Sequence, residues 1–498
     1  MSQNDVVVSE VESDQSQSAG DTPTSKPIHD LIPRQLCLSA PCVAVRWIKE
    51  NTILIAAPQS AWERITSELG SPDFEYEFIS GDESEITDLL MLMTHKDEKS
   101  STASRQMAAI SGEASVTELV DELIDQAVLN RASDLHIEPF EDVLRVRIRV
   151  DGMLRVLTEL PTNFTSPITS RVKIMAQLNI VERRRPQDGQ FTTMVGTRRV
   201  DARVASAATL YGEKIVMRLH DERRPAVSLK ELGMASNQLT DFSRSINAVN
   251  GLIFAAGPTG SGKTTTLHSA LRATSSPFKN VTTIEDPVEY VVPGINQIPV
   301  SEANGTGFAV QLRAILRQDP DVILVGETRD AETARISVQA ALTGHLVLSS
   351  IHATDSIGAV YRLMQMDIEP HLVASSLRSI VSQRLVRKIC HFCREEYEPN
   401  MTEHSLFESR GLEVKTLMRG VGCTFCGGSG YRDRVAAYQL LTITESLAEL
   451  ISSRPDPAEL RRAAVEEGMT TIGYQALVLA QEGVTTMEAA LEFLEYFE

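Results

Sequence analysis

Residues Gly257–Thr264 read GPTGSGKT, which is a complete GxxxxGK[ST] phosphate-binding loop. Its glycines allow backbone N–H groups to turn inward around phosphate oxygens, and the helix that follows adds the positive end of its dipole. Lys263 is expected to reach the β- and γ-phosphates, and the Thr264 hydroxyl is expected to bind Mg²⁺. The predicted nucleotide-binding residues are Gly257, Pro258, Thr259, Gly260, Ser261, Gly262, Lys263, Thr264 and Thr265.

Two acidic residues follow short apolar runs further along the chain. The run Val281–Ile284 leads to Glu285, and the run Val322–Val325 leads through Gly326 to Glu327. Carboxylates at the carboxyl ends of strands in a doubly wound sheet fall in the ligand crevice. One of the two glutamates is expected to polarise the attacking water, while the other orders Mg²⁺ through its water shell. The residues alone leave open which glutamate does which.

A third apolar run, Leu346–Ile351, has His345 before it and His352 after it. A single histidine is more often structural than catalytic. At the end of a strand beside a phosphate-binding loop, however, His352 is equally well placed to sense a γ-phosphate. Both interpretations of His352 stay open at this point.

Four of the six cysteines form two CxxC pairs separated by 29 residues. They are Cys390, Cys393, Cys423 and Cys426. Two CxxC turns at this spacing suit one tetrahedral four-thiolate zinc site of the closed, structural kind. The alternatives are disulfides or free thiols, and a redox CxxC is usually single and near a thioredoxin-like pattern.

A positive segment stands out in an otherwise acidic chain. Between Arg145 and Arg218 there are 14 Lys or Arg residues against 6 acids, whereas the whole chain of 498 residues carries a formal net charge of -19. The arginines either form a solvated face or point at a nucleotide or an acidic neighbour. The acidic balance argues against nucleic-acid binding, which depends on Lys and Arg neutralising phosphates. No long apolar run or secretory signal is visible, so we expect a soluble cytoplasmic protein.

The surrounding sequence indicates the elements that position these residues. The run Leu252–Ala256 predicts a strand directly before the phosphate-binding loop. From Val116 to Asn130, apolar residues recur every three or four residues, which predicts an amphipathic helix. Leu144–Val150 alternates apolar residues with arginines, which predicts a half-buried strand that turns at Asp151 and Gly152. Alternating strands and helices in the second half indicate a parallel sheet.

Several motifs in this order resemble the GspE/PulE family of type II and type IV pilus secretion ATPases. The resemblance runs from about Val116 to Thr486. Besides the phosphate-binding loop, the motifs are ASDLHIEP (132–139), RRRPQDG (183–189), GEK (212–214), TIEDPVEY (283–290), LRQDPDVILVGETRD (316–330), TGHLVLSSIHATD (343–355) and QRLV (383–386).

The resemblance implies an α/β fold: a RecA-like P-loop ATPase domain with a preceding smaller PAS-like α/β domain, a four-cysteine zinc subdomain and a helical C-terminal region. The expected parts are a disordered acidic tail (1–27), a partner-docking domain (28–98), a linker (99–112), an arginine-rich PAS-like domain (113–220), a linker (221–233), the RecA-like ATPase domain (234–386), the zinc subdomain (387–432) and the helical region (433–498).

The resemblance also implies ATP, Mg²⁺ and Zn²⁺ as ligands and a homohexamer in which the arginine-rich domain packs over the nucleotide. It assigns Glu285 as the general base, Glu327 as the Walker B acid, and Arg203 and Arg218 as phosphate-neutralising residues. It also places His345 and His352 in the histidine box. The expected partner is the cytoplasmic domain of an inner-membrane secretion platform protein, and the chain would contact the membrane only through that partner.

The leading hypothesis is a cytoplasmic ATPase, peripheral at the inner membrane, that powers assembly of the pseudopilus in type II protein secretion. Type IV pilus assembly is the alternative within the same enzyme class. A nucleotide-gated scaffold that does not hydrolyse ATP is a further alternative, against which the intact Lys263, Glu285 and Glu327 argue. A nucleic-acid translocase is disfavoured by the acidic charge and by the lack of interleaved aromatic and basic residues.

Overall fold

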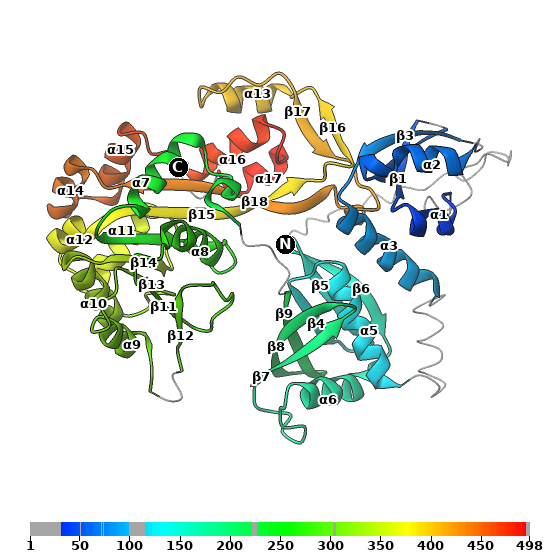
Figure 1. The fold of residues 1–498 in the computed structure, drawn as a ribbon, viewed down its shortest axis with the longest axis horizontal. Helices are drawn as coiled ribbons and strands as arrows, with labels where there is room; N and C mark the ends of the chain where they lie inside the picture. The colour runs from blue at the N-terminus through cyan, green and yellow to red at the C-terminus, as the bar shows by residue number, and fades with distance from the viewer. Residues whose placement is uncertain are drawn as a thin grey trace, which may run out of the picture. The chain divides into compact units, whose positions relative to one another are not determined.

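The computed structural model describes residues 31–98, 115–221, 227–301 and 305–494, apart from residues 50, 71 and 73. The chain divides into two compact units, Met1–Asp97 and Glu98–Glu498 (Figure 1). The predicted acidic tail and the linker predicted for 99–112 lie outside the described residues. No described helix is both long enough and apolar enough to span a bilayer.

The first unit is a small α/β domain. Its sheet has the order β1-β2-β3, with β1 antiparallel and β3 parallel to β2. Trp62 stacks on Phe78, with 5.4 Å between the ring centroids. The elements are α1 (Arg34–Ser39), β1 (Val43–Lys49), β2 (Thr52–Ala57), η3 (Gln59–Ala61), α2 (Trp62–Leu69), β3 (Glu75–Ser80) and α3 (Glu83–Glu98).

The second unit begins with a six-stranded antiparallel sheet of order β6-β5-β4-β9-β8-β7. Helices α5 and α6 share a hydrophobic core with this sheet. Helix α5 confirms the amphipathic prediction and begins after Ser115, whose hydroxyl accepts from the N–H of Glu118. The elements are α5 (Val116–Leu129), β4 (Asp134–Pro139), β5 (Leu144–Val150), β6 (Met153–Leu160), η4 (Thr162–Phe164), α6 (Thr165–Met175), β7 (Gln187–Val195), β8 (Arg198–Thr209) and β9 (Gly212–Asp221).

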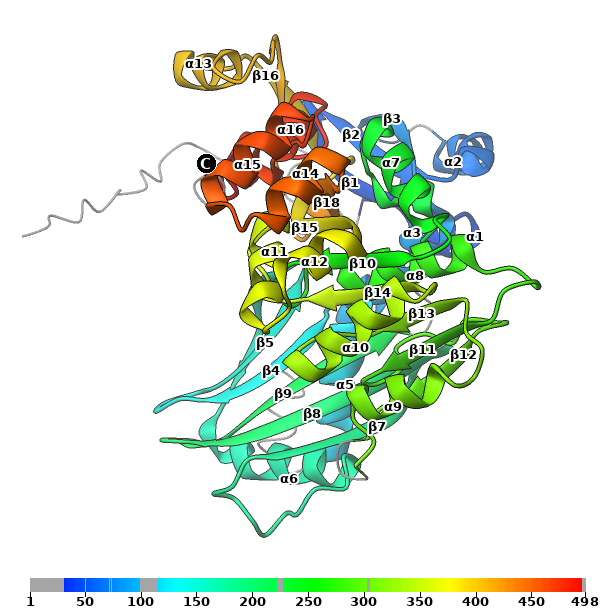
Figure 2. The ribbon, with the colours of Figure 1, turned by 90° about the vertical axis from the view of Figure 1, so that its left-hand side faces the viewer.

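The sheet that carries the phosphate-binding loop has seven strands in the order β12-β11-β13-β14-β10-β15-β18. All neighbours are parallel except β15 and β18. In β10, Leu252 and Phe254 pack into one core with α9 to α12, and Ile253 packs into a second core with α7 and α8. Helices α9 and α10 lie beside β11, β13 and β14 (Figure 2). Both faces of the sheet are therefore covered, which explains its continuous apolar runs.

The elements up to the end of the parallel strands are η5 (Leu229–Leu232), α7 (Ser236–Ile246), β10 (Gly251–Ala256), α8 (Lys263–Thr274), β11 (Val281–Glu285), β12 (Asn296–Pro299), α9 (Phe308–Ile315), β13 (Val322–Val325), α10 (Ala331–Leu342), β14 (Leu346–Ile351), α11 (Ser356–Gln365), α12 (Pro370–Ser376) and β15 (Leu377–Ile389). η5 lies within the predicted linker 221–233, of which residues 222–226 are not described.

The helical prediction for 433–498 is wrong at its start, because Tyr431–Thr442 forms strand β18. β18 pairs antiparallel with β15 from Ser379 and Thr442 to Ile389 and Tyr431, so the ATPase sheet extends past residue 386. The apolar residues of this stretch show neither a clear helical nor a clear strand periodicity. The stretch forms a strand because it pairs with β15. The remaining elements are β16 (Arg394–Tyr397), α13 (Met401–Glu408), β17 (Leu417–Gly420), α14 (Glu445–Ser452), α15 (Pro457–Glu466), α16 (Ile472–Gln481) and α17 (Met487–Leu491).

Candidate functional site

The phosphate-binding loop joins the end of β10 to the start of α8. Gly262 has a φ of 90°, and a Cβ there would lie 2.9 Å from Nε2 of Gln383. That amide donates a 2.7 Å hydrogen bond to the carbonyl of Ser261. At Gly257, with a φ of 147°, a Cβ would come within 2.6 Å of the Ser261 hydroxyl oxygen. The loop shape therefore requires glycine at both positions.

Lys263 is the first residue of α8, and its Nζ donates to the carbonyls of Gly257 and Pro258 at 2.9 Å each. Burial lowers the pKa of Lys263, and the nearby positive charge of Arg384 lowers it further. The negative charge of Glu327 acts in the opposite direction and raises the pKa. Thr264 and Thr265 lie half-buried in the first turn of α8. The predicted phosphate-binding residues therefore lie together in one loop and turn.

Glu285 ends β11 and is 4% exposed. Its Oε1 accepts from the hydroxyl of Thr283 at 2.7 Å and from Nε2 of Gln297 at 2.9 Å. Its Oε2 lies 3.1 Å from Nε2 of His268. Burial raises the pKa of Glu285, but the hydrogen bonds from His268, Gln297 and Thr283 outweigh burial and lower it. The carboxylate is therefore held as an anion with most of its acceptor sites in use.

Glu327 follows β13, and His352 follows β14, at the carboxyl ends of neighbouring parallel strands. Nε2 of His352 lies 3.5 Å from Oε2 of Glu327, and Arg329 forms an ion pair with Oε1. The His352 side chain is 52% exposed, compared with 15% for Glu327. Glu327 is also close enough to Lys263 to act on its pKa. His345 precedes β14 and therefore lies at the opposite end of that strand.

The oxygen ligands that Mg²⁺ prefers are available at this edge of the sheet. Parallel strands β11 and β13 bring the Glu285 and Glu327 carboxylates to the edge where β10 leads into the loop and into Thr264. Mg²⁺ is usually held by one or two carboxylates together with substrate phosphates. The residues present therefore fit a site for Mg²⁺ with a nucleoside triphosphate.

Arg203 of β8 and Arg218 of β9 are directly paired across the two strands, so both side chains lie on one face of the sheet. Nε of Arg218 lies 3.3 Å from Oδ1 of Asp134, but the Arg218 side chain remains 62% exposed. Arg203 is exposed as well. Within the described part of the chain, neither arginine forms a hydrogen bond or ion pair with the phosphate-binding loop. The structure brings the two arginines together, but separately from Lys263.

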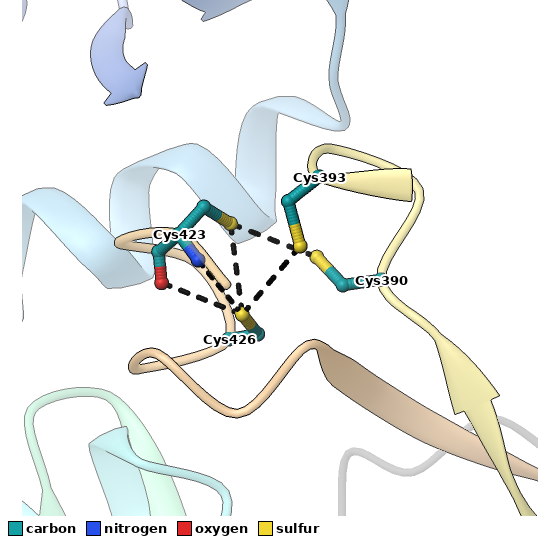
Figure 3. Close-up of side chains that lie close together, drawn as sticks. All are labelled: Cys390, Cys393, Cys423 and Cys426. Atoms are coloured by element: carbon teal, nitrogen blue, oxygen red, sulfur yellow. Dashed lines mark hydrogen bonds between the residues drawn. The ribbon is translucent and has the colours of Figure 1, made fainter. Parts of the chain in front are cut away.

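The four cysteines of the two CxxC pairs converge between β15 and β18 (Figure 3). Their Sγ atoms are 3.7 Å apart for Cys390 and Cys423, 3.9 Å for Cys393 and Cys426, and 3.7 Å for Cys423 and Cys426. Sulfurs around a tetrahedral zinc ion, with bonds of about 2.3 Å, lie about 3.8 Å apart. The cluster therefore fits Zn²⁺.

Backbone groups support this cluster. The N–H groups of Cys423 and Gly430 donate to Sγ of Cys426 at 3.1 and 3.2 Å. Such backbone donors favour the thiolate form of Cys426, which is the form that binds metal.

Three polar residues around the nucleotide site were not among the predicted site residues. His268 and Gln297 contact Glu285, and Gln383 braces the loop at Ser261. Gln383 belongs to the QRLV motif, so the motif gave a signal for it. His268 and Gln297 lie outside any strand-end pattern, and only the fold places them beside the carboxylate.

A covered parallel sheet with a phosphate-binding loop and strand-end carboxylates defines the class of RecA-like P-loop ATPases. Residues 109–492 match the family described as type II/IV secretion system protein. This match covers more than half of the chain, so the chain belongs to that family. The predicted resemblance to secretion ATPases is thereby confirmed.

Relatives come from both secretion and pilus systems. The chain is 42% identical over 379 residues to the type II secretion system ATPase E of Vibrio cholerae, covering 76% of this chain and 75% of that protein. It is 43% identical over 388 residues to the type IV pilus assembly ATPase PilB of Myxococcus xanthus. This alignment covers 77% of this chain and 68% of that protein.

Two solved structures share the fold. The ATPase DotB of Legionella pneumophila aligns with a TM-score of 0.57 at 21% identity, over 76% of this chain and 95% of that chain. The pilus retraction motor PilT with bound ADP aligns with a TM-score of 0.52 at 26% identity, over 76% of this chain and 97% of that chain. The RecA-like prediction is therefore confirmed for the fold.

Proposed function

We propose that this protein hydrolyses ATP to power assembly of the pseudopilus in type II protein secretion. The observation that carries the proposal is the meeting of Lys263, Glu285 and Glu327 at the carboxyl edge of one parallel sheet. A scaffold that only binds nucleotide would not need two acidic groups beside the phosphates. The similarity to type II secretion ATPases supports the choice of process.

In the proposed reaction, a water oxygen attacks the γ-phosphorus of ATP and the bond to the bridging oxygen of ADP breaks, which yields ADP and inorganic phosphate. Lys263 neutralises charge on the β- and γ-phosphates. Thr264 would hold Mg²⁺ directly, and Glu285 would hold it through a water molecule. The bound ion would neutralise negative charge on the phosphate oxygens. Glu327 accepts the proton of the attacking water.

The proposed base differs from the assignment that the family resemblance implies. Three donors already occupy the buried Glu285 carboxylate and lower its pKa, which makes it a weak base and a good permanent anion. Glu327 also has a charged partner, Arg329 at Oε1. It is, however, more exposed than Glu285 and lies near Lys263 and His352. His352 then orients Glu327 or senses the γ-phosphate.

We further propose a homohexamer in which Arg203 and Arg218 reach the nucleotide held by a neighbouring subunit. Their exposed pairing on one sheet face supports this role, because phosphoryl transfer often uses arginines supplied by another domain or subunit. Residues 28–98 are proposed to dock on the cytoplasmic domain of an inner-membrane platform protein. The chain would then work in the cytoplasm, peripheral to the inner membrane, without binding nucleic acid.

The similarity to PilB keeps type IV pilus assembly as the second candidate. The two candidates can be separated by deleting the gene and complementing the deletion with either the wild type or Glu327→Gln. For type II secretion, the deletion should abolish exoprotein secretion and leave type IV pili intact. Only the wild type should then restore secretion. Loss of pili with normal secretion would contradict the proposal and favour the second candidate.

A further inference from the structure

His268 lies on α8, the helix that begins with Lys263, and it is 4% exposed. Its position five residues after Lys263 places it between one and two turns into the helix. From there its Nε2 reaches Oε2 of Glu285 at 3.1 Å. Helix α8 therefore contributes both the phosphate-binding lysine and a contact to the buried carboxylate.

The chemistry of this contact fixes the direction of the hydrogen bond. An ionised carboxylate only accepts hydrogen bonds, so Nε2 of His268 carries the proton and donates it. Nδ1 of His268 is buried and has no hydrogen-bond partner within the described residues. Because His268 has its single described polar contact at Nε2, its side chain is committed to Glu285.

The other two donors to Glu285 come from the sheet. Thr283 lies on β11 itself, and Gln297 lies on the neighbouring strand β12. Nε2 of Gln297 also donates to the carbonyl of Tyr290 at 2.8 Å, and the Tyr290 ring lies edge-on to His268, with 6.0 Å between centroids. Among the hydrogen bonds found in the described residues, only that of His268 ties the Glu285 carboxylate to the phosphate-binding helix.

We propose that His268 is a positioning residue that fixes the Glu285 carboxylate relative to the phosphate-binding loop, so that Glu285 keeps its place in the water shell of Mg²⁺. This inference rests on the proposed function, because it gives Glu285 a role in holding the metal. A buried histidine that served packing alone would not need to aim its donor at that carboxylate. Outer-shell partners of this kind typically change metal affinity or activity about 10- to 100-fold when they are removed.

Three substitutions in the full-length protein separate positioning from packing. His268→Gln keeps an N–H donor near the place of Nε2, His268→Asn has its donor near the place of Nδ1, and His268→Leu has none. For each variant we would measure the affinity for ATP with EDTA, the affinity for ATP with Mg²⁺, kcat and KM. Thermal unfolding checks that each variant is folded.

The gain in ATP affinity on adding Mg²⁺, and kcat, are expected to fall about 10- to 100-fold in the Leu and Asn variants. Affinity for metal-free ATP should stay as in the wild type. The Gln variant should keep most of the Mg²⁺-dependent gain in ATP affinity and most of the wild-type kcat. If the Leu variant fails to fold, the Gln and Asn variants still decide, because they carry the same amide and differ by one methylene.

Equal values for the Gln and Asn variants, or a Leu variant with the full Mg²⁺-dependent gain and normal kcat, would overturn the inference. Failure of the proposed function looks different, since the wild type itself would then hydrolyse no ATP. The Mg²⁺-dependent gain in binding would still report on His268 in that case.

Discussion

Nε2 of His352 lies 3.5 Å from Oε2 of Glu327, although the two residues follow different strands. They meet because β13 and β14 pair in parallel, from Val322 and Leu346 to Val325 and Ser349, so that both strands end at one edge. The donor-rich, buried surroundings of Glu285 contrast with this more open pair. The two carboxylates therefore have distinct environments, which predicts distinct roles.

Glu327→Gln should leave MgATP binding near that of the wild type but lower turnover about 10²- to 10⁴-fold, because a general base is lost. Glu285→Gln should instead weaken Mg²⁺-dependent binding, and its turnover should recover partly at high Mg²⁺. Isothermal titration and phosphate release at several Mg²⁺ concentrations check both variants. If Glu285→Gln loses turnover as deeply as Glu327→Gln with normal Mg²⁺ binding, the base is Glu285.

Arg218→Ala should reduce turnover much more than it weakens ATP binding, because its charge acts on the transferring phosphoryl group. Arg244→Ala, which removes an exposed arginine paired with Asp241 on α7, is the matched control and should change neither. Turnover per chain should also rise with protein concentration, since a neighbouring chain would supply Arg218. Concentration-independent turnover that survives Arg218→Ala would contradict the role of the arginines.

The purified protein should contain about one zinc ion per chain, as four thiolates around one site require. Cys390→Ser should lose the metal and lower the melting temperature, because metal binding contributes folding free energy. Cys37→Ser, at a buried cysteine of the first unit, is the control and should keep the zinc. Elemental analysis and thermal unfolding measure both effects; a zinc-free wild type with an unchanged Cys390→Ser variant would show that no site exists.

The nucleotide site could be predicted largely from sequence because its parts are local. The loop before Lys263 has a fixed geometry, and the strands before Glu285 and Glu327 are unbroken apolar runs. Each CxxC turn is local as well, and the spacing of the two turns predicts one metal site. A short segment therefore contains the physical reason for the loop, for each strand and for each turn.

Features that depend on pairing between distant segments were not predictable. β18 is a strand because β15 lies beside it, and its own sequence does not distinguish strand from helix. Likewise, the donors that surround Glu285 come from α8 and β12, so the lowered pKa of Glu285 follows from tertiary structure. This is also why the sequence left open which of the two glutamates is the base.

Phosphate release from MgATP measures whether this protein hydrolyses ATP with the loop at Lys263. The full-length wild type should turn over ATP at a concentration that allows assembly. Lys263→Ala should abolish turnover, because the phosphates lose the cation that the loop places beside them. A wild type that binds MgATP without releasing phosphate would show that the protein is not an ATP hydrolase. A Lys263→Ala variant that turns over as fast as the wild type would show that the loop does not carry the reaction.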